Sequence, residues 1–402
     1  MGGKLNIIVQ NPYMQAGGAE NRIKLLLQEL VRRPEIDTLH FVFSGLEPAH
    51  TVQAEEKFHL WQIKPGANLP VLRNIMKEWD IDVFQFHNNQ EFGTRGLELA
   101  QSKGIPTVYV MHDFWPLCYQ RFMMRVWDAE SFPVCIDTPT ARPYECLECV
   151  GEYYYNLYLK QLEAIKKCDV GIVPSNRIKD IFEKNNVLVG KWKIVEPWID
   201  LTAFTPAPIQ KRPYQVFFAG NYIPHKGFRV LLRAWAHVNK RLPMANLLAQ
   251  GDSRVLDETI NYSKNHKVQN VQLIEHVPQE RLRELYSESA ITVFPSIWEE
   301  TIGLIWVESL ACGTPVICSR TGSIPELLKF GGETFEPRDD VELAERIIDI
   351  LLSPSKQRKY AQEGYDYVKK NFSPIRAGDD FLKIYTKLEV DRYAKQTNKT
   401  VD

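Results

Sequence analysis

The chain has 402 residues, of which 44% are hydrophobic and 25% charged, so it can bury the cores of two or three globular domains. Its net charge of −1 gives no argument for nucleic-acid binding. No segment approaches the roughly 18 apolar residues of a membrane-spanning helix, and the polar start Met1–Lys4 is unlike a signal peptide. We therefore expect a cytoplasmic protein; peripheral association with the inner face of a membrane and the oligomeric state stay open.

Short apolar segments alternate with helical patterns along the chain, as in α/β units joined by right-handed crossovers. The first sheet is predicted from strands at Leu5–Gln10, Leu39–Phe43, Val83–Phe86, Thr107–Met111 and Val170–Val173. The second is predicted from Gln215–Ala219, Ala245–Gln250, Val271–Ile274, Ile291–Phe294 and Pro315–Cys318. The intervening helices include Glu20–Arg32, Asn156–Lys167, Gly227–Lys240 and Glu280–Ser289.

Four prolines cluster near the middle of the chain, between Glu196 and Pro213, and suit a stiff linker. We therefore predict a first domain over residues 1–198 and a second over 199–375, with a helical tail over 376–402. Ligands of open α/β sheets bind at the carboxyl ends of the strands. A cleft between two such domains is the expected site.

Three features of the first domain follow predicted strands. Gly17 and Gly18 come after the first strand and open the first helix, where backbone N–H groups can approach an anion; a tight turn is the alternative. His112 follows the strand that ends at Met111, and His87 follows Phe86. Either histidine can line a site or serve as a hydrogen-bonded structural residue.

Four cysteines fall in or beside a long segment, Trp115–Val150, which is predicted to be an insertion in the first domain. Cys146 and Cys149 have the Cys-x-x-Cys spacing of structural zinc sites, and Cys118 and Cys135 complete a set of four. A zinc ion would help to order such a loop. The alternative is that these cysteines are free thiols or partly buried small residues.

Two loops of the second domain carry polar residues after predicted strands. The segment from Gly220 to Gly227 contains Asn221, His225 and Lys226. The segment Glu275-His276-Val277-Pro278 follows the strand Val271–Ile274.

The most informative segment runs from Phe294 to Ile317. The residues from Ile302 to Ala311 are almost all apolar and predict a buried helix, with the carboxylate of Glu308 in its middle. A buried carboxylate needs a partner. Glu300 precedes the helix, and Gly303 lies at its start, where free N–H groups favour phosphate. The alternative is that Glu308 pairs with a buried arginine or caps a neighbouring helix.

This acid–glycine–acid segment closely resembles the Glu-x7-Glu signature of the retaining glycosyltransferases of family 4, which have the GT-B fold. The resemblance extends over nearly the whole chain, through Gly17-Gly18, His112 and Lys226-Gly227. It implies two Rossmann-like α/β/α domains facing across a cleft, with the C-terminal helix crossing back to the first domain.

The resemblance also implies a role for each matching residue. Glu300 and His112 would orient the donor sugar, Lys226 would bind the diphosphate, and Glu308 would hold the ribose. The backbone of Ile302, Gly303 and Leu304 would approach the sugar and the diphosphate, Gly17 and Gly18 would close over the phosphate, and the backbone around His276 and Val277 would read the base. Asn221 stands where the family has an arginine. Either His225 or Arg320 would have to compensate for that missing cation.

These roles imply transfer of a hexose from a UDP- or GDP-sugar to a hydroxyl of a sugar or glycoconjugate, with retention, as in polysaccharide or glycan assembly. No covalent nucleophile is evident, and no cofactor is required for catalysis. Two alternatives remain: another GT-B enzyme, such as a sugar phosphorylase or a nucleotide-sugar epimerase, and a non-catalytic partner subunit. The identities of the base, the sugar and the acceptor do not follow from the sequence.

Overall fold

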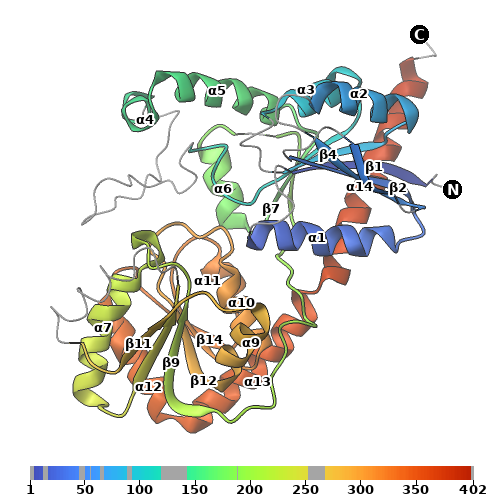
Figure 1. The fold of residues 1–402 in the computed structure, drawn as a ribbon. Coiled ribbons are helices and arrows are strands. Elements are labelled where there is room, and N and C mark those ends of the chain that lie inside the picture. Colours follow the sequence, from blue (N-terminus) through green and yellow to red (C-terminus); the bar gives the residue numbers. More distant parts are fainter. Residues whose placement is uncertain are drawn as a thin grey trace. The chain divides into compact units, whose positions relative to one another are not determined.

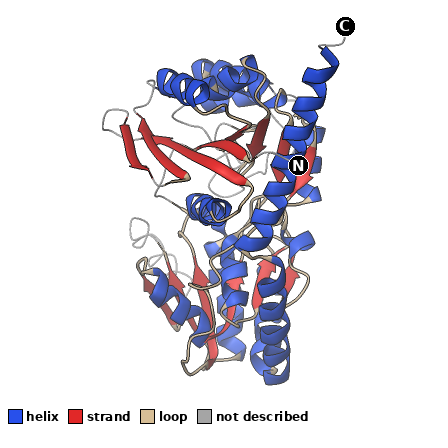
Figure 2. Cartoon of the chain, turned by 90° about the vertical axis from the view of Figure 1, so that its right-hand side faces the viewer, coloured by secondary structure: helices blue, strands red, loops and turns tan. Residues whose placement is uncertain are grey.

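A computed structural model describes residues 4–11, 17–44, 50–54, 56–63, 68–87, 93–118, 143–187, 189–251 and 268–399 (Figure 1). Its contacts divide the chain into two compact units. The described residues of unit 1 are those up to Pro197 together with residues 374–399, and those of unit 2 are residues 198–373. In both units helices lie on either face of the sheet (Figure 2), which confirms the predicted Rossmann-like α/β architecture.

Unit 1 contains a sheet in the strand order β3-β4-β2-β1-β5-β6-β7-β8. All its pairs are parallel except β3 with β4. The strands are β1 (Leu5–Gln10), β2 (Ile36–Ser44), β3 (His50–Ala54), β4 (Phe58–Ile63), β5 (Val83–Phe86), β6 (Thr107–Val110), β7 (Val170–Val173) and β8 (Trp192–Ile194). The predicted central strands are confirmed, but β3, β4 and β8 at the two sides of the sheet were missed.

The helices of unit 1 are α1 (Gly18–Val31), α2 (Asn68–Glu78), α3 (Arg95–Ser102), α4 (Pro143–Val150), α5 (Glu152–Lys166), α6 (Asn176–Lys184) and α14 (Pro374–Lys399). Figure 1 shows α2, α3 and α5 on one face of the sheet and α1 on the other. Helix α14 packs against α1 and buries Phe381 and Tyr385 completely. Arg33 at the end of α1 forms a 2.8 Å ion pair with Asp379 of α14. The last helix is therefore a structural part of unit 1.

Unit 2 contains a parallel sheet in the order β11-β10-β9-β12-β13-β14. Its strands are β9 (Arg212–Ala219), β10 (Asn246–Gln250), β11 (Val271–Ile274), β12 (Ser289–Phe294), β13 (Val316–Ser319) and β14 (Gly332–Phe335). Its helices are the short η1 (Pro224–Lys226), then α7 (Phe228–Arg241), α9 (Gln279–Glu288), α10 (Leu304–Ala311), α11 (Ile324–Leu327), α12 (Asp340–Leu352) and α13 (Pro354–Asn371).

The core of unit 2 lies on both faces of this sheet because the central strands are buried on both sides, from Gln215 to Ala219 in β9 and throughout β12. The inner face of α7 presents Phe228, Leu231, Leu232, Trp235 and Val238 at helical spacing, all buried. Trp306 and Leu310 of α10 are buried on another part of the core with Tyr286 of α9. Burial of this kind stabilises each large side chain by about 1.5–3 kcal/mol, so α10 is rigidly fixed behind the loop that precedes it.

None of the helices in the described part of the chain is both long enough and apolar enough to cross a bilayer.

Candidate active site

Two loops of unit 2 meet at the carboxyl ends of β9 and β12, which are neighbouring parallel strands. The loop after β9 leads into η1, and the loop after β12 leads to α10. The backbone N–H of Ile297 donates to the carbonyl of His225 at 2.9 Å, and the hydroxyl oxygen of Ser296 lies 3.1 Å from the same carbonyl oxygen. The predicted Lys226 and Glu300 segments are thus locked together at the edge where ligands of such sheets bind.

Glu300 lies at the centre of this contact and is only 2% exposed. Its Oε1 accepts three hydrogen bonds, from Lys226 Nζ at 2.8 Å, from Ser296 Oγ at 2.7 Å and from Trp298 Nε1 at 2.5 Å. A buried carboxylate with this many donors is stable as an anion. The carboxylate therefore presents fixed acceptor oxygens at the carboxyl end of β12.

Lys226 reaches Glu300 because the backbone turns sharply behind it. Gly227 has φ of +72°, and a Cβ at this position would lie 1.8 Å from the carbonyl oxygen of Pro295, so only glycine fits. The ammonium of Lys226 lies 5.2 Å from the Trp298 ring centroid and 5.7 Å from that of Phe294. These aromatic rings add to the stabilisation of the cation.

The burial of Glu308 differs from the predicted one. The helix begins at Leu304 and not at Ile302, and Glu308 is only partly buried on it, whereas Glu300 is the fully buried acid. Helix α10 has one side that is incompletely covered, and the apolar sequence did not reveal this. Glu308 neither pairs with an arginine in the contacts described nor caps a helix; its Oε2 accepts from the Tyr286 hydroxyl at 3.0 Å. Burial raises the pKa of Glu308 to about 7, and the Tyr286 hydrogen bond opposes that rise.

The backbone between these two acids has the form expected for close approach of a ligand. Gly303 has φ of +68° and directly precedes α10. Ile302 is buried, while Gly303 and Leu304 are partly exposed. The first backbone N–H groups of α10 have no partners within the helix, which makes this end suitable for an anion.

Asn221 is held by a hydrogen-bonded chain. Its Oδ1 lies 2.9 Å from His276 Nε2, and the other ring nitrogen of His276 bonds with Gln250. Val277, next to His276, packs against the core of unit 2. The chain fixes the loop after β11, but Asn221 itself carries no charge.

His225 and Arg320 were the two candidates to replace the family's arginine, and neither compensates for it in the structure. Burial, followed by the nearby charge of Lys226, lowers the pKa of His225 to about 4, so His225 is neutral at neutral pH. The guanidinium of Arg320 pairs with Glu336. Lys226 is accordingly the cation that this part of the structure places beside Glu300.

In unit 1 the predicted histidines form a buried chain at the carboxyl ends of β5 and β6. The hydroxyl of Tyr385 donates to Gln85 Oε1, so the amide nitrogen of Gln85 faces His87 Nε2 at 2.6 Å. His87 Nδ1 then lies 2.7 Å from His112 Nε2. Since the amide can only donate, His87 carries its proton on Nδ1 and donates to His112, which leaves the His112 proton on Nδ1.

Both histidines are neutral. Burial lowers the pKa of His87 to about 3, with a further contribution from Arg22. Burial, His87 and Arg22 also hold the pKa of His112 well below its usual value. His112 can therefore donate a hydrogen bond from Nδ1 but cannot supply a proton as an acid near neutral pH.

The sequence interpretation missed Arg22, which is 5% exposed on the inner face of α1. Burial and the charge of Arg376 lower its pKa to about 9. Helical periodicity could have shown that Arg22 is buried, because it shares the spacing of the buried Ile23, Leu26 and Leu30. Gly17 precedes α1 in extended conformation and Gly18 is the first residue of the helix; most of the loop before them lies outside the described residues.

The cysteine prediction stays a prediction. Cys118, Cys146 and Cys149 are partly buried in unit 1, whereas Cys135 and most of the predicted insertion lie outside the described residues. Within the described part, no three cysteine, histidine or carboxylate side chains are grouped closely enough to hold a metal ion.

Comparison with known families identifies both halves of the chain. A model described as glycosyl transferases group 1 matches residues 202–367, and one described as glycosyltransferase family 4 matches residues 16–203.

Individual relatives are distant. The alpha-maltose-1-phosphate synthase of Mycolicibacterium smegmatis is 22% identical over 61% of this chain and 70% of its own length. Spore coat protein SA of Bacillus subtilis is 26% identical over 43% of this chain. The match spans about half of that relative, 48% of its length.

Solved structures show the same fold at low identity. Sucrose-phosphate synthase from Thermosynechococcus elongatus has a TM-score of 0.71 at 15% identity, covering 96% of this chain and 100% of that one. HepE from Anabaena, in complex with UDP-glucose, has a TM-score of 0.68 at 14% identity and covers 95% of this chain and 100% of its own.

Proposed function

The chain belongs to the group 1 and family 4 glycosyltransferases, and from this premise we propose that it transfers a hexose from a nucleotide diphosphate sugar to a hydroxyl of a sugar or glycoconjugate, with retention of configuration. The observation that carries the proposal is the ion pair between the partly exposed Lys226 and the buried Glu300 at the carboxyl ends of β9 and β12. A cation and an acceptor at one sheet edge suit the phosphate and the hydroxyls of such a donor.

Lys226 is proposed to stabilise the diphosphate as it leaves. Negative charge grows on the bridging oxygen in the transition state, and a cation fixed in advance lowers its energy without reorganising. The N-terminus of α10 behind Gly303 adds backbone donors to the same task. Because Asn221 supplies no charge, leaving-group stabilisation depends more on these two features here than where an arginine is present.

The two acids are proposed to orient the donor. Glu300 would accept hydrogen bonds from sugar hydroxyls while its contacts with Ser296 and Trp298 keep it in place. Glu308 would accept from the ribose hydroxyls, with Tyr286 fixing one of its oxygens. A carboxylate that accepts two hydroxyls gives specificity for a ribose.

His112 is proposed to donate a hydrogen bond from Nδ1 to the donor sugar. Since its pKa lies well below the usual value, it does not protonate the leaving group at neutral pH. We infer that the departing phosphate oxygen takes the proton of the acceptor hydroxyl, which needs no further acid or base.

The direct test is binding of donors by calorimetry against a panel of UDP- and GDP-sugars. UDP-glucose is the first choice because HepE is held in complex with it. We expect at least one donor to bind and Glu308→Ala to weaken it by about tenfold. Glu345→Ala, which removes an exposed carboxylate on α12 of the same unit, is the control. Absence of binding across the panel would contradict the proposal.

A second candidate is a non-catalytic partner subunit, which the uncharged Asn221 in place of the family's arginine favours. Incubation of a bound donor with mixed acceptors separates the two. Donor binding without turnover in wild type and Glu300→Ala alike would favour the partner subunit.

A further inference from the structure

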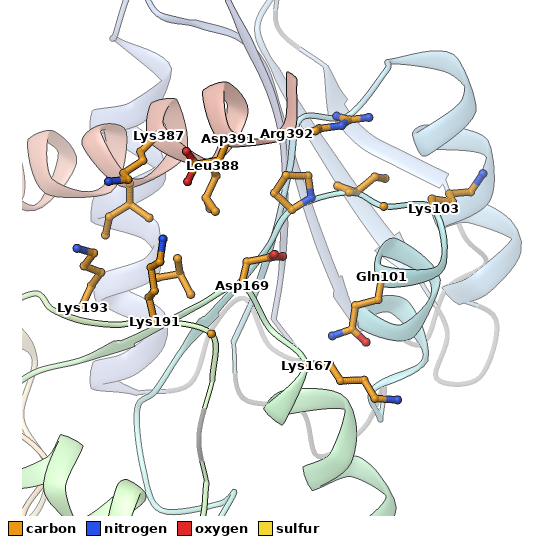
Figure 3. Close-up of a pocket in the computed structure, with 16 residues that line it drawn as sticks. Gln101, Lys103, Lys167, Asp169, Lys191, Lys193, Lys387, Leu388, Asp391 and Arg392 are labelled. Carbon is orange, nitrogen blue, oxygen red and sulfur yellow. The ribbon is translucent and has the colours of Figure 1, made fainter. Parts of the chain in front are cut away.

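Unit 1 contains a pocket at the edge of its sheet opposite to the histidine chain. Pro106, Asp169 and Lys191 line it and lie just before β6, β7 and β8 respectively. One side of α14 closes the pocket through Ile384, Lys387 and Leu388 (Figure 3). Its volume is about 620 Å³, which is in the range of sites for small organic ligands.

The lining of this pocket is strongly cationic. Its six cations come from four separate segments and are Lys103, Lys167, Lys191, Lys193, Lys387 and Arg392. The acids are Asp169 and Asp391. Asp169 is already used within the fold, because its Oδ2 accepts from the backbone N–H of Thr107 at 2.8 Å and from its hydroxyl at 3.0 Å.

Three lysines gather on one side of the pocket. Figure 3 shows Lys191 and Lys193 on the side of Asp169 that also holds Lys387 of α14. Among the described residues, no carboxylate lies within ion-pair distance of these three ammonium groups. All three side chains are exposed, and an anion between them would lower their mutual repulsion.

An alternative explains part of this charge. Strand β8 is the edge of the sheet, and lysines on an edge strand prevent pairing with another chain. That accounts for Lys191 and Lys193 but not for Lys387, which lies on a helix. It also does not explain the apolar residues between the cations, which include Ile105, Val170 and Leu388. Charge around an apolar floor suits a ligand with a phosphate and a non-polar part.

We propose that this pocket is a second binding site, for a small organic phosphate, distinct from the residues assigned to the nucleotide-sugar donor. The phosphate lies among Lys191, Lys193 and Lys387, each ammonium offering three donors. Such a ligand joins α14 to the segments that precede β6, β7 and β8. Because it binds the folded state only, it raises the stability of unit 1.

The test measures binding of pyrophosphate to the full chain by calorimetry at low salt. The variant carries Lys191→Gln, Lys193→Gln and Lys387→Gln. A matched control carries Lys77→Gln, Lys160→Gln and Lys184→Gln, which removes three exposed charges elsewhere in unit 1. We expect the pocket variant to bind about tenfold or more weakly and the control to bind within about twofold of wild type.

Pyrophosphate can also bind at Lys226, so Lys226→Met is measured in parallel. A binding event that Lys226→Met retains and the pocket variant loses supports the second site, whether or not the proposed donor function holds. Loss in Lys226→Met alone overturns it, as does equal weakening in the pocket variant and its control.

The source of the phosphate is decided by a vesicle arm. One outcome is that wild type co-sediments with phosphatidylglycerol vesicles without binding free pyrophosphate. If the pocket variant then loses this co-sedimentation, the same site is assigned to a lipid headgroup. The proposal is wrong if the pocket variant binds both probes as well as wild type does and also self-associates. In that case the lysines protect the edge strand.

Discussion

The carboxyl edges of the two sheets hold different kinds of polar network. In unit 2, Lys226 and Glu300 are both charged and close to each other, and their other contacts come from the same two loops. In unit 1, His87 and His112 are neutral, and the hydrogen bond that sets their protons comes from Tyr385, 300 positions after Gln85. The network of unit 2 is suited to binding a ligand through charge, whereas the network of unit 1 orients one N–H donor, that of His112 Nδ1.

The largest expected effect comes from breaking the charged network with Glu300→Ala. It leaves Lys226 without its carboxylate and the buried Trp298 N–H without this acceptor, while the Ser296 hydroxyl keeps the carbonyl of His225 as an acceptor. We expect sugar transfer to fall by about 10²–10³-fold and stability to fall by about 3 kcal/mol. Initial rates and chemical denaturation measure the two effects.

Glu345→Ala is the matched control, since its carboxylate is exposed on α12 of the same unit. Equal losses in the two variants would show that Glu300 has no special place in the site.

The neutral network predicts a pH dependence of stability. The pKa of His87 is about 3 in the folded protein and about 6.5 when unfolded. Between these values the unfolded chain binds a proton that the folded chain does not. Stability is therefore unaffected above about pH 6.5 and is lost as the pH falls below it, by about 1.4 kcal/mol per unit for this histidine.

Denaturation of wild type and His87→Gln between about pH 6.5 and 4.5 isolates this contribution, because other groups that titrate in this range, such as His40, are common to both proteins. We expect the slope of wild type to be steeper. Parallel slopes would mean that His87 is charged in the folded protein.

Glu308, in unit 2, has a smaller effect on the pH dependence of stability, and its sign is opposite to that of His87. Its pKa is raised to about 7, so the folded protein keeps a proton that the unfolded chain loses above about pH 4.5, and stability falls as the pH rises from about 4.5 to 7. The ionised form is the better acceptor for ribose. Nucleoside diphosphate affinity should therefore rise up to about tenfold between about pH 6 and 8.

Calorimetric titrations at several pH values measure this rise. In Glu308→Gln the affinity should be lower and nearly independent of pH, whereas a rise that persists in this variant would have to come from another group.

The smallest effect is expected for Tyr385→Phe, which removes the donor to Gln85 in the neutral network. A buried acceptor without its partner costs about 1–2 kcal/mol. Thermal unfolding measures the loss. Tyr153→Phe, at a tyrosine with 74% exposure, should be neutral. If Tyr385→Phe is also neutral, the hydroxyl does not fix the orientation of Gln85.

The sequence predicted best those features that depend on near neighbours. Short, mostly apolar segments bounded by polar ones located β1, β5, β7 and β11 at their observed bounds. Strands β4 and β8 were missed because they lie at the sides of the sheet and mix polar with apolar residues. Glu308 was placed in a fully buried helix because composition does not show which side of α10 stays open.

By itself, then, the sequence determined two α/β units and the local motif that joins Gly303 to its two flanking acids, because strand periodicity and glycine chemistry act over a few residues. Only the tertiary structure decided which acid is buried, which histidine nitrogen carries the proton and where six cations converge. Those outcomes depend on segments that the chain brings together from hundreds of residues apart, as Tyr385 and Gln85 show. Burial and charge act through space, and the sequence records only their order along the chain.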